Sequence, residues 1–476
     1  MSEELLHIIA SSKVLLPELI LIMALVLVIM FKLILNNKTQ QQLASWLTSL
    51  ITLAGLFLII WFKAPINETI FNGLLLDDYT ARYSDLFVLI AGVIVLIHIK
   101  IIKYNFDAEV YIIFLGLILG LLLLAKTQHF ISFFVLLEMV SLCSYILVGM
   151  LRQSLQLEAS IKYLLFGILS AGVFLYGISF VFGLSHSFDF QNITLYFAGQ
   201  NTSIFHSVLL FLVLVGPLFK LSAFPFHIWA PDVYEAGPTP IISFLSVAPK
   251  IVALVLVYKT LQLGIADSKW VLSILIMTSI VIGNLAALRQ TNSKRMMGYS
   301  GIAQAGFMLI GLLALDENGM QSSLLYAGFY VFISTGTFFL LDIFERHTHA
   351  YTFSSLAGIG SKNLALGLVA VVFMMALVGL PPTSGFTAKF LVFSSLWASY
   401  QSSSETILMV VLLLAVINTA VALFYYFKIP YQLFLGKAST EAKPIYANPL
   451  LWLLGGLVIF LFFTPGIIYL FLGPNI

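Results

Sequence analysis

The chain has 476 residues, of which 61% are hydrophobic and only 9% are charged, whereas an ordinary soluble domain carries about 25% charged residues. This composition, with a mean hydropathy of +1.05, excludes a cytosolic enzyme, a nucleic-acid-binding protein and a disordered scaffold. The net charge of +2 indicates no class of partner. Because a bilayer core of about 30 Å takes roughly 20 apolar residues per helix, we expect an all-α polytopic membrane protein.

Fourteen apolar stretches are long enough to be transmembrane spans. The loops between them are mostly short, and no segment outside them is long enough for a soluble domain. The acidic start of the chain lacks the basic region of a signal peptide, so we expect the first span to direct insertion. In chain order, the spans are 14–35, 43–62, 79–99, 110–125, 129–150, 158–183, 206–222, 240–262, 269–290, 294–315, 320–345, 363–400, 405–427 and 448–473.

The basic residues between the spans divide unequally, which predicts the orientation. With an even number of spans, both termini lie on one side of the membrane. Six basic residues fall on that side: Lys13, Lys63, Arg82, Lys126, Lys259 and Lys269. Thirteen fall on the other side: Lys32, Lys38, Lys100, Lys103, Arg152, Arg289, Lys294, Arg295, Arg346, Lys362, Lys428, Lys437 and Lys443. We therefore expect both termini on the non-cytoplasmic side.

The seventh and twelfth spans contain prolines that remove helical hydrogen bonds. Pro217 and Pro225 lie in or directly after the seventh span, and Pro381 and Pro382 lie within the twelfth. Each missing N–H frees a carbonyl four residues earlier. Irregular backbone at membrane depth is tolerated only where it is buried in protein or lines a wet cavity. We therefore expect both helices to be broken, although proline and glycine are also common in ordinary membrane helices.

The two breaks lie five spans apart, and this spacing predicts an internal repeat. A five-helix unit has an odd number of spans, so its second copy must insert upside down. We expect N-terminal helices in 1–109, a first five-helix repeat in 110–262 and a second, inverted repeat in 269–434. A C-terminal helix in 448–476 completes the chain.

Four charged residues lie inside apolar spans: Glu138, Lys220, Lys250 and Lys389. Each costs at least about 2.5–3.5 kcal/mol in the bilayer centre, so a functional role is the default hypothesis. A buried lysine can gain or lose a proton as a carboxylate moves closer or further away, which suits a proton relay. A static ion pair of Glu138 with one lysine is the alternative. His227, just after the first break, could pass protons or could only pack against backbone.

The residues indicate no cofactor site in this chain. The single cysteine, Cys143, excludes an internal disulfide and a four-cysteine iron–sulfur site, and we expect it to be a packing residue. The sequence has no phosphate loop of the G-x-x-x-x-G-K-[ST] type. We find no convincing pair of histidines for a haem and no metal site.

Long motifs of this sequence resemble the antiporter-like (Mrp-type) membrane subunits of respiratory complex I. The resemblance rests on FKLSAFPFHIWAPDVYEAGPTPIISFLSVAPK, LLEMVSLCSYILVG, SKRMMGYSGIAQAGFMLIG and GLPPTSGFTAKF, and it runs across essentially the whole chain. It implies fourteen helices with inverted repeats in spans 4–8 and 9–13. It also implies that Glu138 and Lys220 are the family's pair in helices 5 and 7, with Lys250 in helix 8 and Lys389 in helix 12.

The resemblance implies redox-driven proton translocation by a chain without a redox centre of its own. FMN, iron–sulfur clusters and a quinone would then belong to other subunits of an NADH:quinone oxidoreductase. The expected partners are neighbouring small membrane-arm subunits, another antiporter-like subunit and lipids, in a bacterial inner (plasma) membrane. Two alternatives stay open: a subunit of an Mrp-type multisubunit cation/proton antiporter, and a structural spacer of the membrane arm whose charges are vestigial.

Overall fold

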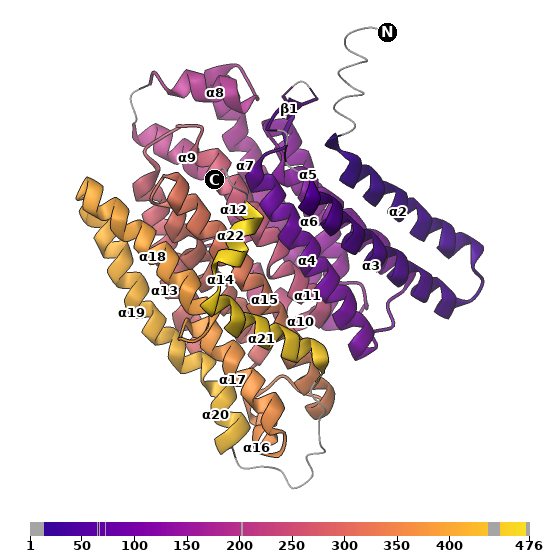
Figure 1. Cartoon of the computed structure of the whole chain (residues 1–476). Coiled ribbons are helices and arrows are strands. Elements are labelled where there is room, and N and C mark those ends of the chain that lie inside the picture. Colours follow the sequence, from indigo (N-terminus) through magenta and orange to yellow (C-terminus); the bar gives the residue numbers. More distant parts are fainter. Residues whose placement is uncertain are drawn as a thin grey trace. The chain divides into compact units, whose positions relative to one another are not determined.

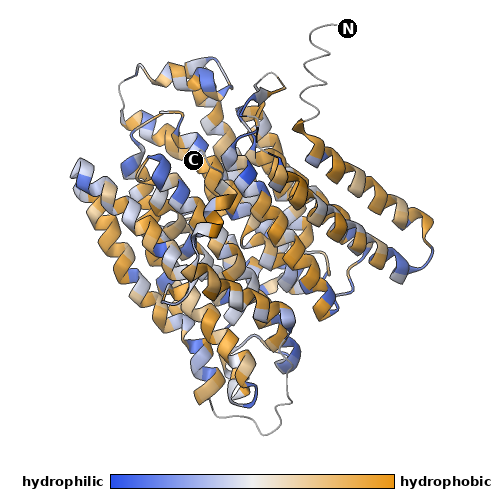
Figure 2. Cartoon of the chain, in the orientation of Figure 1, coloured by the Kyte–Doolittle hydropathy of each residue, from blue (hydrophilic) through white to orange (hydrophobic). Residues whose placement is uncertain are grey.

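The structure, a computed structural model, describes residues 14–63, 65, 67–71, 73–200, 203–436 and 448–472. Nearly all of these residues are helical (Figure 1). Hydrophobic residues cover most of each long helix, and hydrophilic residues gather toward helix ends and loops (Figure 2). Lys13, Lys437 and Lys443, which entered the count of basic residues, lie outside the described residues.

Each expected span coincides with one helix or with two consecutive helices. Those of the first half are α2 (Leu16–Ile34), α3 (Lys38–Phe62), α4 (Tyr79–Ile102), α5 (Ala108–Ala125), α6 (Phe130–Val148), α7 (Ser154–Ser185), α9 (Ile204–Leu221), and α11 (Thr239–Leu245) with α12 (Ala248–Leu261). Those of the second half are α13 (Ser268–Leu288), α14 (Ser293–Leu312), α15 (Glu317–Thr348), α17 (Leu364–Val378) with α18 (Ser384–Ser403), α19 (Thr406–Tyr426), and α21 (Pro449–Phe463) with α22 (Gly466–Leu472).

Short elements join the long helices. They are β1 (Thr69–Ile70), β2 (Leu75–Leu76), α8 (Phe190–Phe197), α10 (Trp229–Ala236), the 3₁₀-helix η1 (Phe353–Leu356), α16 (Ile359–Lys362) and α20 (Lys428–Leu435). The two strands form an antiparallel hairpin in which Thr69 pairs with Leu76. This hairpin is a small departure from the all-α prediction, because hydropathy does not report on two-residue strands in a loop.

Among the described residues, eleven helices are long and apolar enough to cross a membrane. The chain is therefore a polytopic helical membrane protein, and the count of fourteen spans stays a prediction. Side-chain caps start several of the long helices where polar residues end the loops. Asp78 accepts a hydrogen bond from the Ala81 N–H at 2.7 Å, and Asn292 accepts from the Lys294 N–H at 2.9 Å.

The chain divides into two compact units. One contains residues 1–220, 251–268 and 471–476, and the other contains residues 221–250 and 269–470. In the first unit, α2 packs against α3 and α5, and α5 packs against α6. In the second, α14 and α18 both pack against α15. These compact units are defined by contacts, whereas the predicted repeats at 110–262 and 269–434 are defined by the spacing of the two breaks. The repeat boundaries therefore stay a prediction.

The two broken segments differ in where the helix stops. In the twelfth span, the helix ends at Val378 and resumes at Ser384, so the predicted break at Pro381 and Pro382 is confirmed. In the seventh span, two prolines were candidates for the predicted break; α9 continues through Pro217, and the non-helical segment that follows α9 contains Pro225. A proline costs the helix a single hydrogen bond, and α9 keeps the remainder. The actual break begins at Ser222, whose φ of 56° is left-handed, and ends where α10 starts.

Candidate functional site

Lys220 lies in the last turn of α9, directly before the first break. Its side chain is 3% exposed, and its Nζ has no hydrogen-bond partner among the described residues. Three rings surround the Nζ, with centroids 5.6 Å away in Tyr145, 5.5 Å in Tyr163 and 5.7 Å in Phe219. Aromatic rings attract a cation without accepting a proton from it. The three rings therefore stabilise the ammonium form of Lys220, while none of them forms a hydrogen bond that would hold the proton on its Nζ.

Glu138 is near enough to Lys220 for electrostatic attraction. Within the described part of the chain, the two side chains form no ion pair, and Glu138 is half-buried. The structure therefore brings Glu138 and Lys220 near each other without direct contact between the carboxylate and the ammonium group. A static ion pair, the alternative considered above, needs direct contact between ammonium and carboxylate.

Glycine makes room for the ring next to Lys220. A Cβ built on Gly167 of α7 would lie 1.8 Å from the Tyr145 hydroxyl oxygen, a separation that no side chain can adopt. With any larger residue at position 167 the Tyr145 ring would have to move, so glycine lets this ring lie against α7 as it does here. The tight packing of α6 and α7 holds the aromatic cage, defined here as Tyr145, Tyr163 and Phe219, around Lys220.

The second unit holds Lys250 and Lys389, each almost fully buried at 1% and 4% exposed. Lys250 Nζ donates a hydrogen bond to the Gly301 carbonyl of α14 at 2.5 Å. Lys389 Nζ donates to the Val378 carbonyl at 2.7 Å and lies 4.2 Å from the Phe307 ring centroid. No carboxylate pairs with either lysine among the described residues. A carbonyl stabilises an ammonium but takes no proton from it, so neither proton is locked in an ion pair.

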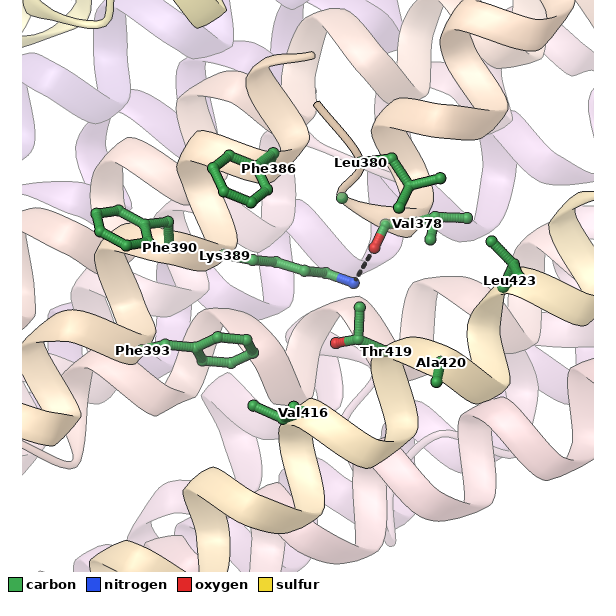
Figure 3. A pocket seen from close by; sticks show the side chains of 11 residues that line it. Val378, Leu380, Phe386, Lys389, Phe390, Phe393, Val416, Thr419, Ala420 and Leu423 are labelled. Atoms are coloured by element: carbon green, nitrogen blue, oxygen red, sulfur yellow. Dashed lines mark hydrogen bonds between the residues drawn. The ribbon is translucent and has the colours of Figure 1, made fainter. Parts of the chain in front are cut away.

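The break in the twelfth span supplies the partner of Lys389. The Val378 carbonyl belongs to the last turn of α17, where the helix ends and carbonyls lose their intrahelical donors. Lys389 extends from α18 across a cavity of about 470 Å³ toward this carbonyl (Figure 3). Phe386, Phe390 and Phe393 of α18 line one wall, and Val416, Thr419, Ala420 and Leu423 of α19 line the other. The lysine is therefore the charged group in a largely apolar pocket.

A buried polar network, not anticipated from the sequence, lies on α14 between the partners of the two lysines. Gln304 donates to the Leu377 carbonyl at 3.0 Å and to the Tyr426 hydroxyl at 3.1 Å. Tyr326 donates to the Gln304 side-chain oxygen, and Ser300 shares a hydrogen bond of 2.5 Å with Tyr426. Gly301, Gln304 and Phe307 follow one another at helical spacing along α14. The sequence contained one indication of this network: Ser300 and Gln304 are polar residues four positions apart in an apolar helix, so they lie on the same face of it.

If Lys250 and Lys389 exchange protons, as the sequence predicts, replacing Gln304 with leucine is expected to slow that exchange while leaving the packing nearly intact. Leucine has a similar volume but removes the group that joins Tyr326 and Tyr426. Its cost in stability should be about 1–3 kcal/mol from unpaired hydroxyls. Proton uptake by vesicles containing the intact complex measures the effect. Uptake at the wild-type rate would show that this network is only structural.

His227 lies in the irregular segment between α9 and α10. Its Nδ1 is buried and has no hydrogen-bond partner among the described residues, and its ring is 5.5 Å from that of Phe224. A relay role for His227 stays a prediction. Cys143 is partly buried and is not in a disulfide. Among the described residues, no group of three or more His, Cys, Asp and Glu side chains is arranged to hold a metal ion.

Known proteins match the chain over most of its length. A family model described as "NADH:quinone oxidoreductase/Mrp antiporter, TM" matches residues 127–418. The chain is 36% identical to NAD(P)H-quinone oxidoreductase subunit 2 of Gloeobacter violaceus, over 91% of this chain and 84% of that protein. It is 30% identical to NADH-quinone oxidoreductase subunit N of Chlorobium chlorochromatii, over 91% and 87%. A chain of respiratory complex I from Thermus thermophilus superposes with a TM-score of 0.77 at 28% identity, covering 95% of this chain and 98% of that one.

Proposed function

This chain belongs to the NADH:quinone oxidoreductase/Mrp antiporter family of membrane subunits, and on that premise we propose how it moves protons. It is a proton-translocating, antiporter-like membrane subunit of the subunit N type, in an oxidoreductase complex. We place it in a bacterial plasma membrane, with both termini on the non-cytoplasmic side. FMN, iron–sulfur clusters and the quinone would be held by other subunits, and neighbouring membrane-arm subunits would be its partners.

The proposed path uses Glu138, Lys220, Lys250 and Lys389, with His227 as a further member. The observation that carries it is the state of Lys220, a buried amine that is near a carboxylate but not bonded to it. A small movement of Glu138 toward Lys220 favours the ammonium form, and a movement away favours release of the proton. Lys250 and Lys389, each bonded to a backbone carbonyl, can accept the charge and pass it on.

Lys220→Ala is expected to abolish proton movement through this chain, because it removes the group that carries the proton beside Glu138. Lys162→Ala is the matched control, since Lys162 is a half-exposed lysine of α7 that forms an ion pair with Glu158, 2.8 Å away. The measurement is the number of protons pumped per NADH oxidised by the assembled complex in liposomes. A wild-type ratio in Lys220→Ala, with normal assembly, would contradict the relay and support the structural-spacer alternative.

The quinone-reductase assignment is favoured over the Mrp antiporter by the names of the relatives that align across nine-tenths of the chain. Co-purification distinguishes the quinone-reductase assignment from the Mrp antiporter assignment. We expect the chain to travel with iron–sulfur subunits that oxidise NADH. Isolation with cation-antiporter subunits instead would overturn the assignment and leave the proton path open.

A further inference from the structure

Three charged residues outside the proposed path form a buried cluster at the ends of their helices. Glu18 is in the first turn of α2, Asp85 is in α4, and Lys126 directly follows α5. Their exposed fractions are 2%, 1% and 3%. We call these three residues the buried triad. In the sequence, Lys126 is one of the basic residues between the expected spans, and neither acid has a predicted role.

The buried triad contains two carboxyl groups, from Glu18 and Asp85, and only one amine, from Lys126. Lys126 Nζ donates a hydrogen bond to Glu18 Oε1 and lies 3.0 Å from Asp85 Oδ2. The other oxygens, Glu18 Oε2 and Asp85 Oδ1, are buried and have no hydrogen-bond partner among the described residues. Two unpartnered carboxylate oxygens beside one lysine mark a position where a proton would be stabilised.

Neighbouring charges do not remove the imbalance. Lys259, in the last turn of α12, donates to the carbonyls of Ala125 at 2.8 Å and Thr127 at 3.3 Å. Its Nζ is 4.0 Å from Asp78 Oδ2. The charged groups facing one another here are four acids and three bases: Glu18, Asp77, Asp78, Asp85, Lys126, Lys259 and Arg82. One negative charge is therefore in excess when all seven are ionised.

The β1–β2 hairpin is hydrogen-bonded to the chain at Lys126, beside the triad. The Leu76 N–H donates to the Lys126 carbonyl at 2.7 Å, and the Gln128 N–H donates to the Leu74 carbonyl at 3.0 Å. Leu75 packs with Val14 and Ile70 in a small apolar cluster. Because α2 and α4 begin here, and α5 and α12 end here, the triad lies near a membrane face while remaining shielded from water.

We propose that Glu18 and Asp85 together hold one exchangeable proton, and that this pair is a proton-exchange site at the membrane face where α2 and α4 begin. An uncompensated buried charge is strongly unfavourable, and two carboxyl groups that share a site can avoid it by retaining one proton between them. Binding forms one O–H bond and neutralises the excess charge of the cluster. Release delivers the proton to water at that face and restores the charge.

The site is connected to the proposed path by a single helix. Lys250 lies in the first turn of α12, and Lys259, beside the triad, lies in its last turn. Nine residues of α12, about 14 Å of helical rise, separate the two lysines. This inference rests on the proposed function, since it assigns an aqueous exchange site to the same proton current.

The test uses the assembled complex in liposomes, with Asp85→Asn and Glu18→Gln as variants. Both substitutions keep the shape and mimic the protonated acid, so we expect assembly to survive. Glu109→Gln is the matched control, because Glu109 is also in the first turn of a helix and pairs with Lys32 at 2.6 Å, but is half-exposed. Infrared difference spectra between two pH values, in water and in deuterated water, detect a buried protonated carboxyl. Protons pumped per NADH report on its use.

We expect a protonated-carboxyl band in the wild type that disappears in both variants and persists in Glu109→Gln. We expect pumping to be lost in Asp85→Asn and retained in Glu109→Gln. A wild-type spectrum without such a band overturns the proposal even if no variant assembles. A band with wild-type pumping in Asp85→Asn overturns the exchange role. The band does not depend on Lys220, so normal pumping by Lys220→Ala would count against the relay alone.

Discussion

Lys389→Met is expected to stop proton transfer through the second unit while the subunit still assembles. Methionine fills the space of the lysine stem among Phe386, Phe390 and Phe393. It has no amine, so it can neither donate to the Val378 carbonyl, as Lys389 Nζ does, nor carry a proton. Removing one positioned acid–base group slows proton transfer by roughly 100-fold. The measurement is protons pumped per NADH, together with NADH oxidation by the same liposomes.

Phe390→Met is the control for this substitution. Phe390 lines the same pocket next to Lys389 and is exposed on its outer side, so its replacement changes the pocket wall and keeps the ammonium group. We expect near-normal pumping from this variant. Equal pumping by Lys389→Met and the wild type would show that the charge in the pocket is not used.

Gly385→Ala is expected to destabilise the second unit more than any conservative substitution elsewhere in the broken twelfth span. A Cβ at Gly385 would lie 1.8 Å from the Ala376 carbonyl oxygen and 2.7 Å from its carbon. The obstructing atoms are backbone, so α17 and α18 would have to separate. We expect a loss of about 3 kcal/mol or more, seen as a lower thermal midpoint of the complex and less assembled subunit.

Gly456→Ala in α21 separates this steric effect from helix propensity. A Cβ there meets no atom within 4 Å, and alanine is favoured over glycine within a helix by about 0.5–1 kcal/mol. This variant should be neutral or slightly stabilising. If Gly385→Ala also proved neutral, the close approach of α17 and α18 described here would be wrong.

The helices were predictable from the sequence because their apolar residues are local and continuous. Each predicted span overlaps a helix, although α7 is longer than the apolar stretch that predicted it, with its first turn starting at Ser154. The prolines predicted the position of the helix breaks less well. Helix α9 continues through Pro217, and the chain leaves the helix at Ser222 instead. A single proline removes one hydrogen bond, whereas the position of a break depends on what surrounds the helix.

The candidate site was predictable only as separate residues. Lys220, Lys250 and Lys389 were identifiable because a lysine within an apolar span is costly. Their partners were not identifiable, because Gly301 and Val378 contribute backbone carbonyls that any residue possesses. Gln304 was overlooked because a neutral amide in an apolar helix costs less than a charge, and its partners Tyr326 and Tyr426 come from other helices.

The low content of charged residues determined the membrane character of this chain and the choice of candidate proton-carrying residues, because hydropathy and the cost of a buried charge act on each residue where it stands. Tertiary structure decided which charges are paired. Glu18, Asp85 and Lys126 each look like ordinary residues near the ends of spans, and they form a buried triad only because α2, α4 and the end of α5 meet. Attraction between charges depends on distance in space, which the order of residues does not specify.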